Sequence, residues 1–403
     1  MVSEHRGRRL AVTVALLSML APFSIDTYLP SFPDIAAEFA VSPVYLQQTL
    51  SFYLLAFAVM TLVYGPLSDS FGRRRVVLGA VALYVLSSIG CWLAPNGHWL
   101  LAMRVGQGLS ASAGVVVGRA VIRDAFAGAQ AQRVMANASL MFALAPAVAP
   151  IIGGVLHDAF GWRSVFGFLT LFGIAIWAWT AWTLPETLPA VARQSIHPRA
   201  VSGAYWRALG SGRFMGIAAM VSVNFGAMFL YISSSPELIY RHLGGGPNDF
   251  WRLFVPLVGG MMAGTFLSGR LAGRLSHAHA VDLAYGLMLT GALINLALAT
   301  GLEPTAFRVI APLVLYASGM SLAMPNLSLM ALDLFPAHRG LASALLGFLQ
   351  TGSNALVAGL LAPLLAPRLP TLAGGMLVLS ATGFMLWRLA CRRHWLPASA
   401  ALP

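Results

Sequence analysis

Two charged residues lie inside apolar stretches that are long enough to cross a membrane. Asp26 falls well along the stretch Leu10–Tyr28, and Arg104 falls near one end of the stretch Trp99–Ile122. A charge at bilayer depth costs from about 3 to more than 10 kcal/mol, so it is usually kept for function and faces a partner or a watery cavity. We therefore interpret the two residues as parts of a transport pathway.

The chemistry that this pair could perform is proton exchange. A carboxyl group takes up and releases a proton, whereas an arginine guanidinium stays charged. At about 1.5 Å per residue, Asp26 lies about 24 Å from the inner end of its stretch, and Arg104 lies about 22 Å above the inner face of a hydrocarbon core of about 30 Å. We therefore expect the two side chains at similar depth.

Elimination favours Asp26 as the proton carrier. The other carboxylates and the nine histidines fall at the ends of apolar stretches, in loops or in tails. Asp34, near the outer end of its segment, is the second choice. The competing interpretation is that Asp26 serves only as a structural partner of Arg104.

The composition indicates the elements that must position these residues. Hydrophobic residues make up 58% of the 403-residue chain and charged residues 9%, against roughly 45–50% and about 25% in soluble domains. This excess predicts an all-α integral membrane protein with twelve transmembrane helices. Each predicted span has about 20 apolar residues, the length that crosses a bilayer: Leu10–Tyr28, Leu46–Leu67, Val76–Ala94, Trp99–Ile122, Val134–Leu156, Val165–Leu184, Phe214–Ile232, Phe254–Leu271, Val281–Leu302, Val309–Leu332, Leu341–Leu365 and Thr371–Leu389.

The basic residues predict the orientation of the chain. The chain has no lysine, so all 25 basic residues are arginines. With the N-terminus in the cytoplasm, all arginines except Arg104 and five others fall on cytoplasmic segments, which agrees with the positive-inside rule and places both termini inside. This distribution of arginines over many short segments also argues against a nucleic-acid binder, whose charges would gather on one soluble face. The five on the outer side are Arg163, Arg241, Arg252, Arg308 and Arg368.

The two cysteines offer no framework for a disulfide, a zinc site or a haem. Cys91 falls toward the outer end of the third span and Cys391 falls in the inner tail. We therefore expect no metal and no cofactor. The first apolar run is followed by Tyr28-Leu29-Pro30 rather than by small residues, so it does not resemble a cleaved signal peptide.

One longer polar segment divides the chain. Pro185–Arg213 is rich in arginine and separates spans six and seven. We predict an N-terminal six-helix bundle at 1–190, a cytoplasmic linker at 191–212 and a C-terminal six-helix bundle at 213–403. Transporters with two such halves commonly bind substrate at the interface between them, near the midplane.

A run of small, acidic and basic residues follows the second span. An ordinary positively charged loop at the inner face would explain Arg73 and Arg74. It would not explain why Gly65, Asp69 and Gly72 occur at this spacing. Small residues allow close approach, and the acid can cap a helix or pair with an arginine. A similar but weaker pattern of small residues and arginines, Ser268–Arg274, follows the eighth span. The run is Gly65-Pro66-Leu67-Ser68-Asp69-Ser70-Phe71-Gly72-Arg73-Arg74.

This run resembles the loop 2–3 signature of the major facilitator superfamily, G-x-L-x-D-x-x-G-R-[KR]. It matches at every fixed position: Gly65, Leu67, Asp69, Gly72, Arg73 and Arg74. The resemblance implies the major facilitator fold and a gating role for this segment. Asp69 would hold the cytoplasmic gate, with Arg73 nearby.

Three further segments resemble motifs of the same superfamily. Arg104, Gln107 and Gly108 match the helix 4 motif R-x-x-Q-G, which implies that Arg104 belongs to the proton-coupling apparatus. The segment Asp26–Pro30 matches the helix 1 signature D-x-Y-L-P of Bcr/CflA-type multidrug exporters. A helix 5 antiporter motif, in which Ala149 replaces the first glycine, is expected to shape helix 5 against the other half through Pro150, Gly153 and Gly154.

Aromatic, methionine and amide side chains in the spans are candidates for a substrate pocket. A soft apolar pocket would suit varied lipophilic molecules, although packing or lipid contact is the competing interpretation for each aromatic or methionine residue. The candidates are Tyr28, Tyr53, Phe57, Asn137, Met141, Phe229 and Gln350.

The resemblance implies proton-coupled export of drug-like small molecules across the bacterial cytoplasmic membrane by alternating access. The expected partners are drugs, protons and the lipid bilayer, without nucleic acid, and the chain is expected to act as a monomer. The alternative is an exporter or facilitator of a small metabolite such as a sugar or an amino acid. An intramembrane enzyme would need paired catalytic groups at depth, which the spans lack, so we expect no enzymatic activity.

Overall fold

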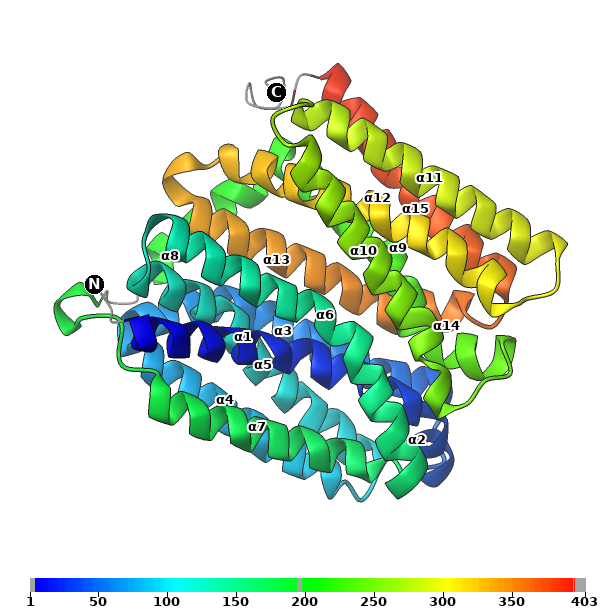
Figure 1. Cartoon of the computed structure of the whole chain (residues 1–403), viewed down its shortest axis with the longest axis horizontal. Coiled ribbons are helices and arrows are strands. Elements are labelled where there is room, and N and C mark those ends of the chain that lie inside the picture. The colour runs from blue at the N-terminus through cyan, green and yellow to red at the C-terminus, as the bar shows by residue number, and fades with distance from the viewer. Residues whose placement is uncertain (1–3, 194–197, 394, 396–403) are drawn as a thin grey trace. The chain divides into compact units, whose positions relative to one another are not determined.

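The computed structural model describes residues 4–193, 198–393 and 395. Within these residues, twelve helical segments are long and apolar enough to cross a membrane. The chain is therefore an all-α, multi-pass membrane protein, as its composition predicts. It divides into two compact units, Met1–His197 and Pro198–Pro403, which are described separately here (Figure 1).

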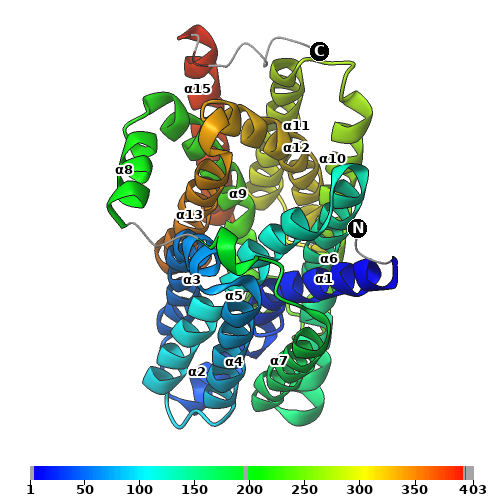
Figure 2. The ribbon, with the colours of Figure 1, turned by 90° about the vertical axis from the view of Figure 1, so that its left-hand side faces the viewer.

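In the N-terminal unit, α5 is the central helix. It packs against α3 and α4, while α1 packs against α5 and α6, and α4 packs against α7 (Figure 2). The elements are α1 (Glu4–Asp26), η1 (Leu29–Ser31), α2 (Phe32–Glu38), α3 (Pro43–Phe71), α4 (Arg73–Trp92), α5 (Gly97–Ala125), α6 (Gly128–Phe160), α7 (Arg163–Thr183) and η2 (Ala190–Ala192).

In the C-terminal unit, α12 packs against α10 and α11, and α15 packs against α9 and α11. The main helices are α8 (Pro198–Leu209), α9 (Gly212–Ser233), α10 (Trp251–Leu271), α11 (His277–Gly301), α12 (Ala306–Asp333), α13 (Arg339–Leu356), α14 (Ala362–Leu365) and α15 (Leu369–Arg392). Short elements join them: η3 (Glu237–His242), η4 (Pro247–Asp249), η5 (Pro336–His338) and η6 (Val357–Leu361).

The predicted linker 191–212 contains a helix. α8 covers most of its second part, and residues 194–197 lie outside the described residues, as do 1–3 of the first predicted bundle and 394 and 396–403 of the second. The hydropathy pattern did not predict this helix, because the linker is polar and has too few apolar residues to form a membrane span.

Polar side chains mark where several spans begin. The Ser42 hydroxyl accepts a hydrogen bond from the Tyr45 backbone amide at 3.1 Å, and the side-chain Oδ1 of Asn96 accepts one from the Trp99 backbone amide at 2.9 Å. Such capping satisfies backbone donors that have no partner inside the helix. These two turns between spans therefore carry residues that mark where the next helix starts.

The second span is longer than its hydropathy predicts. The predicted span ends at Leu67, but Ser68–Phe71 continue α3, and the chain leaves the helix only at Gly72. Gly72 has a φ of 97°, a conformation that glycine adopts without the steric cost a Cβ would add. The residues of this motif therefore lie at a helix end rather than in a loop.

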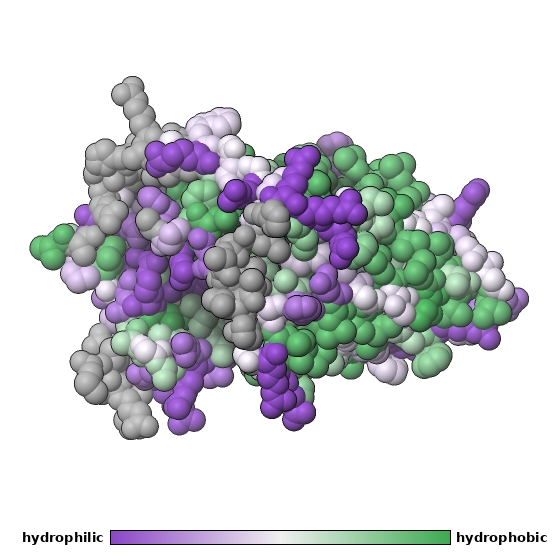
Figure 3. All heavy atoms as spheres, turned by 90° about the horizontal axis from the view of Figure 1, so that it is seen from above, coloured by the Kyte–Doolittle hydropathy of each residue, from purple (hydrophilic) through white to green (hydrophobic). Residues whose placement is uncertain are grey.

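Large apolar side chains cover much of the outer surface of the helices. Leu86, Leu171, Trp182, Val378 and Met385 are each more than half exposed. Figure 3 shows apolar residues over much of the face in view and hydrophilic residues gathered toward one end. An apolar exterior of this extent is what a lipid-facing helix requires.

Candidate functional site

Asp26 is the last residue of α1, where the chain changes into the short helix η1. Its side chain is 3% exposed, and it is the only buried carboxylate among the residues whose side chains the structure describes. Within the described part of the chain, no hydrogen bond or ion pair engages this carboxylate. Burial without a fixed partner leaves the group available to exchange a proton or to meet a partner that moves.

Arg104 lies on α5 and is fully buried. Its Nη1 donates to the backbone oxygen of Ser24 at 2.9 Å and to Oε1 of Gln107 at 2.8 Å. The guanidinium also lies 4.7 Å from the ring centre of Tyr28 and 4.5 Å from that of Tyr53. Aromatic faces attract a cation, so two rings and two neutral oxygens hold this charge in the protein interior.

The guanidinium has no carboxylate partner in the described structure. Its Nε and Nη2 are buried and donate to no described group. Asp26 is two residues beyond Ser24, whose backbone oxygen accepts from Arg104. No described ion pair joins the side chains of Asp26 and Arg104, so the structure does not contain the permanent ion pair that a purely structural role for Asp26 would require.

A network of uncharged side chains fixes Arg104 from two other helices. Gln107, which accepts from Arg104, donates through Nε2 to the Ser88 hydroxyl at 2.8 Å. The Ser24 hydroxyl lies 2.7 Å from the Tyr84 hydroxyl. The sequence motif identified Gln107 but not these serine and tyrosine partners, since nothing in their local sequence distinguishes them from other polar residues in a span.

Glycines bring the helices of this site into close contact. A Cβ added to Gly108 would collide with the backbone carbonyl of Tyr53 on α3. A Cβ added to Gly153 would collide with the backbone carbonyl of Thr27, the residue after Asp26. Pro150 and Gly154 are also buried on α6. Within its own unit, the helix 5 motif therefore packs on the end of α1 that carries Asp26.

Asp34 occupies a different environment from Asp26. It lies on α2 with its side chain 63% exposed, and its Oδ2 is 3.1 Å from Nε2 of His157 on α6. His157 is buried, near the end of that helix. The sequence placed Asp34 near the outer end of the membrane, and its exposure makes it a surface carboxylate rather than one held at depth.

The segment after the second span forms a charged cluster around Arg73. Arg73 is 2% exposed, and its Nη1 is 2.5 Å from Asp69 and donates to the Ser68 hydroxyl at 2.7 Å. Its Nε lies 2.9 Å from Asp124 at the end of α5. Asp69 and Arg73 thus lie together as the motif implies, and Asp124 is an additional member that the sequence assigned only to a span end.

Glu186 joins the cluster to the end of α7. Its Oε1 accepts from the backbone amide of Arg73 at 2.9 Å, which caps the first turn of α4. A Cβ on Gly72 would collide with this carboxylate. Glu186 follows the last residue of α7, Thr183, by three positions, and the sequence assigned it no role in this cluster.

Two other residues of the motif, Arg74 and Gly65, have simpler surroundings. Arg74 donates through Nη2 to the backbone oxygen of Ala181 at 2.7 Å. Gly65 has open space where a Cβ would lie. The role of Arg74 in this structure is therefore to tie α4 to α7, and Gly65 makes no close contact that only glycine permits.

The pocket candidates fall into two groups. Five lie in the N-terminal unit, and of these Tyr28 and Tyr53 pack on Arg104, while Phe57 is 6.5 Å from the Tyr53 ring. The other two of these five, Asn137 and Met141, are exposed and half-buried respectively. In the C-terminal unit, Phe229 is buried and Gln350 is half-buried. Among the described residues, no group of three histidine, cysteine or acidic side chains could hold a metal ion.

Comparison with known proteins decides the family. The family model described as Major Facilitator Superfamily matches residues 14–358. The chain belongs to this superfamily. It is therefore a membrane transporter and not an enzyme, and the predicted family resemblance is confirmed.

Relatives within the superfamily include drug-resistance proteins. The chain is 32% identical to an uncharacterized MFS-type transporter, YdgK, of Bacillus subtilis, covering 87% of this chain and 88% of the relative. It is 28% identical to a bicyclomycin resistance protein homolog of Haemophilus influenzae, covering 93% and 94%. These similarities relate the chain to drug-efflux members of the superfamily.

The fold has close counterparts among solved structures. A bacterial homolog of the human lysosomal transporter Spinster, in an inward-facing and occupied conformation, superposes with a TM-score of 0.74 at 17% identity, covering 97% of this chain and 98% of that one. At this identity the likeness supports the major facilitator fold alone.

Proposed function

We propose that this protein exports drug-like small molecules from the bacterial cytoplasm in exchange for protons. The observation that carries the proposal is the presence, in one unit, of a buried carboxylate, Asp26, and of a fully buried Arg104 that has unused donors and no carboxylate partner. Charges at bilayer depth are costly and mark ion or substrate pathways. The similarity to a bicyclomycin resistance protein homolog supports drug-like substrates.

Proton exchange at Asp26 would change the attraction between α1 and α5. When Asp26 loses its proton, its negative charge is attracted to the Arg104 guanidinium, whose Nε and Nη2 are free to donate. When Asp26 is protonated, that attraction is lost. The two protonation states therefore favour different arrangements, and a substrate that favours the opposite arrangement would be exchanged for the proton.

The charged cluster around Arg73 would act as the cytoplasmic gate. Asp69, Asp124 and Glu186 hold Arg73 and the start of α4 in one arrangement. Movement of α3 relative to α5 would separate Arg73 from one of its acids. We propose alternating access in which this cluster favours one of the two states, with both termini in the cytoplasm.

The same polar and aromatic side chains remain our candidates for substrate contact. Aromatic and methionine surfaces adapt to varied lipophilic molecules, and amides orient them. Tyr28 and Tyr53 are the strongest members, because they contact Arg104 directly and would sense its movement. The other five are Phe57, Asn137, Met141, Phe229 and Gln350.

The test uses a bacterial host that lacks its own efflux pumps. The wild-type chain and Asp26→Asn are expressed at equal membrane levels, and resistance is scored against a panel that includes bicyclomycin and chloramphenicol. Resistance that depends on the proton gradient and is lost in Asp26→Asn is the expected result. Sensitivity to every drug, combined with export of a sugar or amino acid, would replace the proposal with a metabolite exporter.

A further inference from the structure

Arg119 on α5 is a cation without a described partner. Its side chain is exposed, and no ion pair or hydrogen bond in the described structure includes it. Protein atoms nevertheless surround it on most sides. It lies six residues before α5 ends at Ala125, so it belongs to the inner part of the span. A side chain that is both enclosed and exposed faces a hollow rather than open solvent.

Two glycines show which side of α5 carries Arg119. A Cβ on Gly118 would lie 3.0 Å from Cγ1 of Val14 on α1, and a Cβ on Gly108 would collide with the backbone carbonyl of Tyr53 on α3. At 3.6 residues per turn, Arg119 points about 100° away from Gly118 and only about 20° away from Gly108, about three turns further along the helix. The strip of α5 that α3 covers at Gly108 is therefore open at Arg119.

Arg119 is the second cation of α5 that lacks a carboxylate partner. Arg104, fifteen residues earlier, is fully buried and has unused donors. At about 1.5 Å per residue, the two positions are about 22 Å apart along the helix. An arginine side chain keeps its charge in proteins. α5 therefore carries two fixed positive charges in a unit whose one described buried carboxylate is Asp26.

The acids that could offset these charges are held by other groups. Five of them have described partners in the same unit, and these are Asp69 and Asp124 with Arg73, Glu38 with Arg163, Asp34 with His157, and Glu186 with the backbone amide of Arg73. A hollow lined by one sign of charge, with protein walls of low dielectric constant, focuses the field of that charge. The side of α5 that carries Arg119 therefore attracts anions and repels cations.

Binding of lipid headgroups is the competing interpretation for an arginine near the end of a span. Long basic side chains can reach the bilayer surface from inside the hydrocarbon region. The position of Arg119 does not favour this role, because protein encloses the side chain and its strip of α5 packs on α3 rather than on lipid. Arg123, one turn closer to the helix end and exposed, is better placed for headgroups.

We propose that Arg119 is a specificity-determining residue that selects substrates by charge. It favours lipophilic anions and neutral molecules with exposed oxygen acceptors, and it excludes lipophilic cations. This inference rests on the proposed export function, since it names the charge class of the molecules that the same pathway carries. The guanidinium acts by attraction and by hydrogen bonds to carboxylate, phenolate or carbonyl oxygens of the substrate.

Two lipophilic ions of nearly the same size and shape, tetraphenylborate and tetraphenylphosphonium, test the inference. Equilibrium dialysis against purified full-length protein in detergent, corrected with empty micelles, gives a dissociation constant for each ion. We expect the wild type to bind the borate anion about tenfold more tightly than the phosphonium cation. Equal affinity, or tighter binding of the phosphonium, would overturn the proposal.

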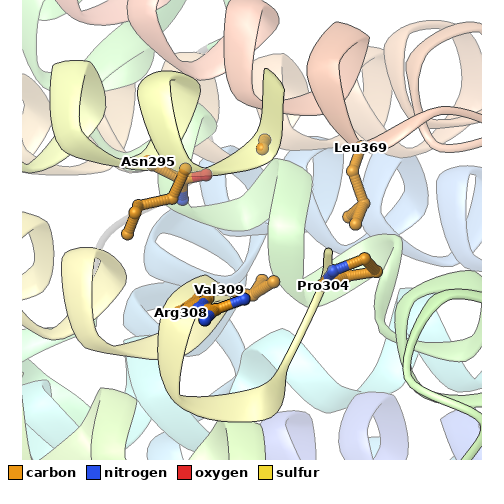
Figure 4. A pocket seen from close by; sticks show the side chains of 7 residues that line it. Asn295, Pro304, Arg308, Val309 and Leu369 are labelled. Atoms are coloured by element: carbon orange, nitrogen blue, oxygen red, sulfur yellow. The ribbon is translucent and has the colours of Figure 1, made fainter. Parts of the chain in front are cut away.

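Three variants separate the charge of Arg119 from the rest of the protein. Arg119→Gln should reduce the preference for the anion by about tenfold, whereas Arg119→Lys should keep it, because the charge is retained. Arg308→Gln removes the same charge from the start of α12 in the C-terminal unit and should leave the preference unchanged (Figure 4). A wild-type preference in Arg119→Gln would overturn the assignment.

Failure of the export function would look different from failure of the charge selection. Preferential anion binding through Arg119, without proton-dependent resistance in the pump-deficient host, would refute the export function and leave the charge selection in place. Proton-dependent resistance that is lost in Asp26→Asn, combined with equally efficient export of tetraphenylphosphonium, would overturn the charge selection alone.

Discussion

Gly153 on α6 lies directly against the backbone carbonyl of Thr27, the residue that follows Asp26. The helix 5 motif therefore sets the position of the proposed proton carrier from a neighbouring helix. The departure from the motif at Ala149 does not alter this contact, because Ala149 is buried at a different turn of α6. The contact gives the first of four predictions.

Gly153→Ala should impair export without preventing membrane insertion. The added methyl would collide with the Thr27 carbonyl, and overpacking of this kind typically costs about 1–3 kcal/mol. The end of α1 would shift, and the proposed proton carrier Asp26 would move with it. Drug resistance and membrane level are measured together, and Gly79→Ala, where a Cβ meets open space, is the matched control. Equal resistance in both variants would contradict the assigned role.

Asp26→Asn should abolish proton-coupled export. The amide has nearly the same shape but cannot exchange a proton, so substrate added to detergent-purified protein should no longer release protons. Asp26→Glu should retain part of the activity. Asp34→Asn is the control, because that carboxylate is exposed and paired with His157. Persistent proton release in Asp26→Asn, together with its loss in Asp34→Asn, would move the carrier to Asp34.

Arg104→Ala should reduce coupling more than it reduces substrate binding. The substitution removes the charge that attracts deprotonated Asp26 but leaves the rings of Tyr28 and Tyr53 in place. Arg104→Lys should restore only part of the coupling, because an ammonium group cannot donate to Ser24 and Gln107 in the same planar geometry. Coupled transport and equilibrium binding are measured on the same preparations. Normal coupling in Arg104→Ala would remove this residue from the mechanism.

Asp69→Asn should slow transport while the protein still folds and inserts. Arg73 would keep Asp124 and Ser68 as partners, so the buried cation would not be left alone. Glu186→Gln should weaken the cap on α4, an effect of about 0.5–2 kcal/mol for comparable capping residues. Transport rates in proteoliposomes provide the measurement, and Gly65→Ala is a control at an open position. A wild-type rate in Asp69→Asn would contradict the gate.

The sequence was sufficient to predict the spans because membrane-crossing helices need long apolar runs. It was not sufficient to predict where they end. Ser68–Phe71 extend α3 beyond the predicted end at Leu67 although they include serine and aspartate, since residues beyond the hydrocarbon core need no apolar character. The same limit hid α8, which lies outside the spans.

The candidate site was predictable to a similar extent. Asp26 and Arg104 could be found because an isolated charge in an apolar run is rare. Their partners Ser24, Tyr84 and Ser88 are uncharged and come together only through tertiary packing. Asp124 and Glu186 were missed for another reason: acids at span ends are common, and only the fold brings these two to Arg73.

The Arg104 network includes a thiol that makes it open to chemical measurement. Cys91 is fully buried on α4, and its Sγ lies 3.8 Å from Oε1 of Gln107, the residue that holds Arg104. The only other cysteine, Cys391, is half-buried near the end of α15. Alkylation of Cys91 by a membrane-permeant maleimide therefore reports the entry of solvent into the network, with Cys391→Ser removing the second reactive group. The rate of this irreversible reaction thus reports how often the network opens, without an engineered label.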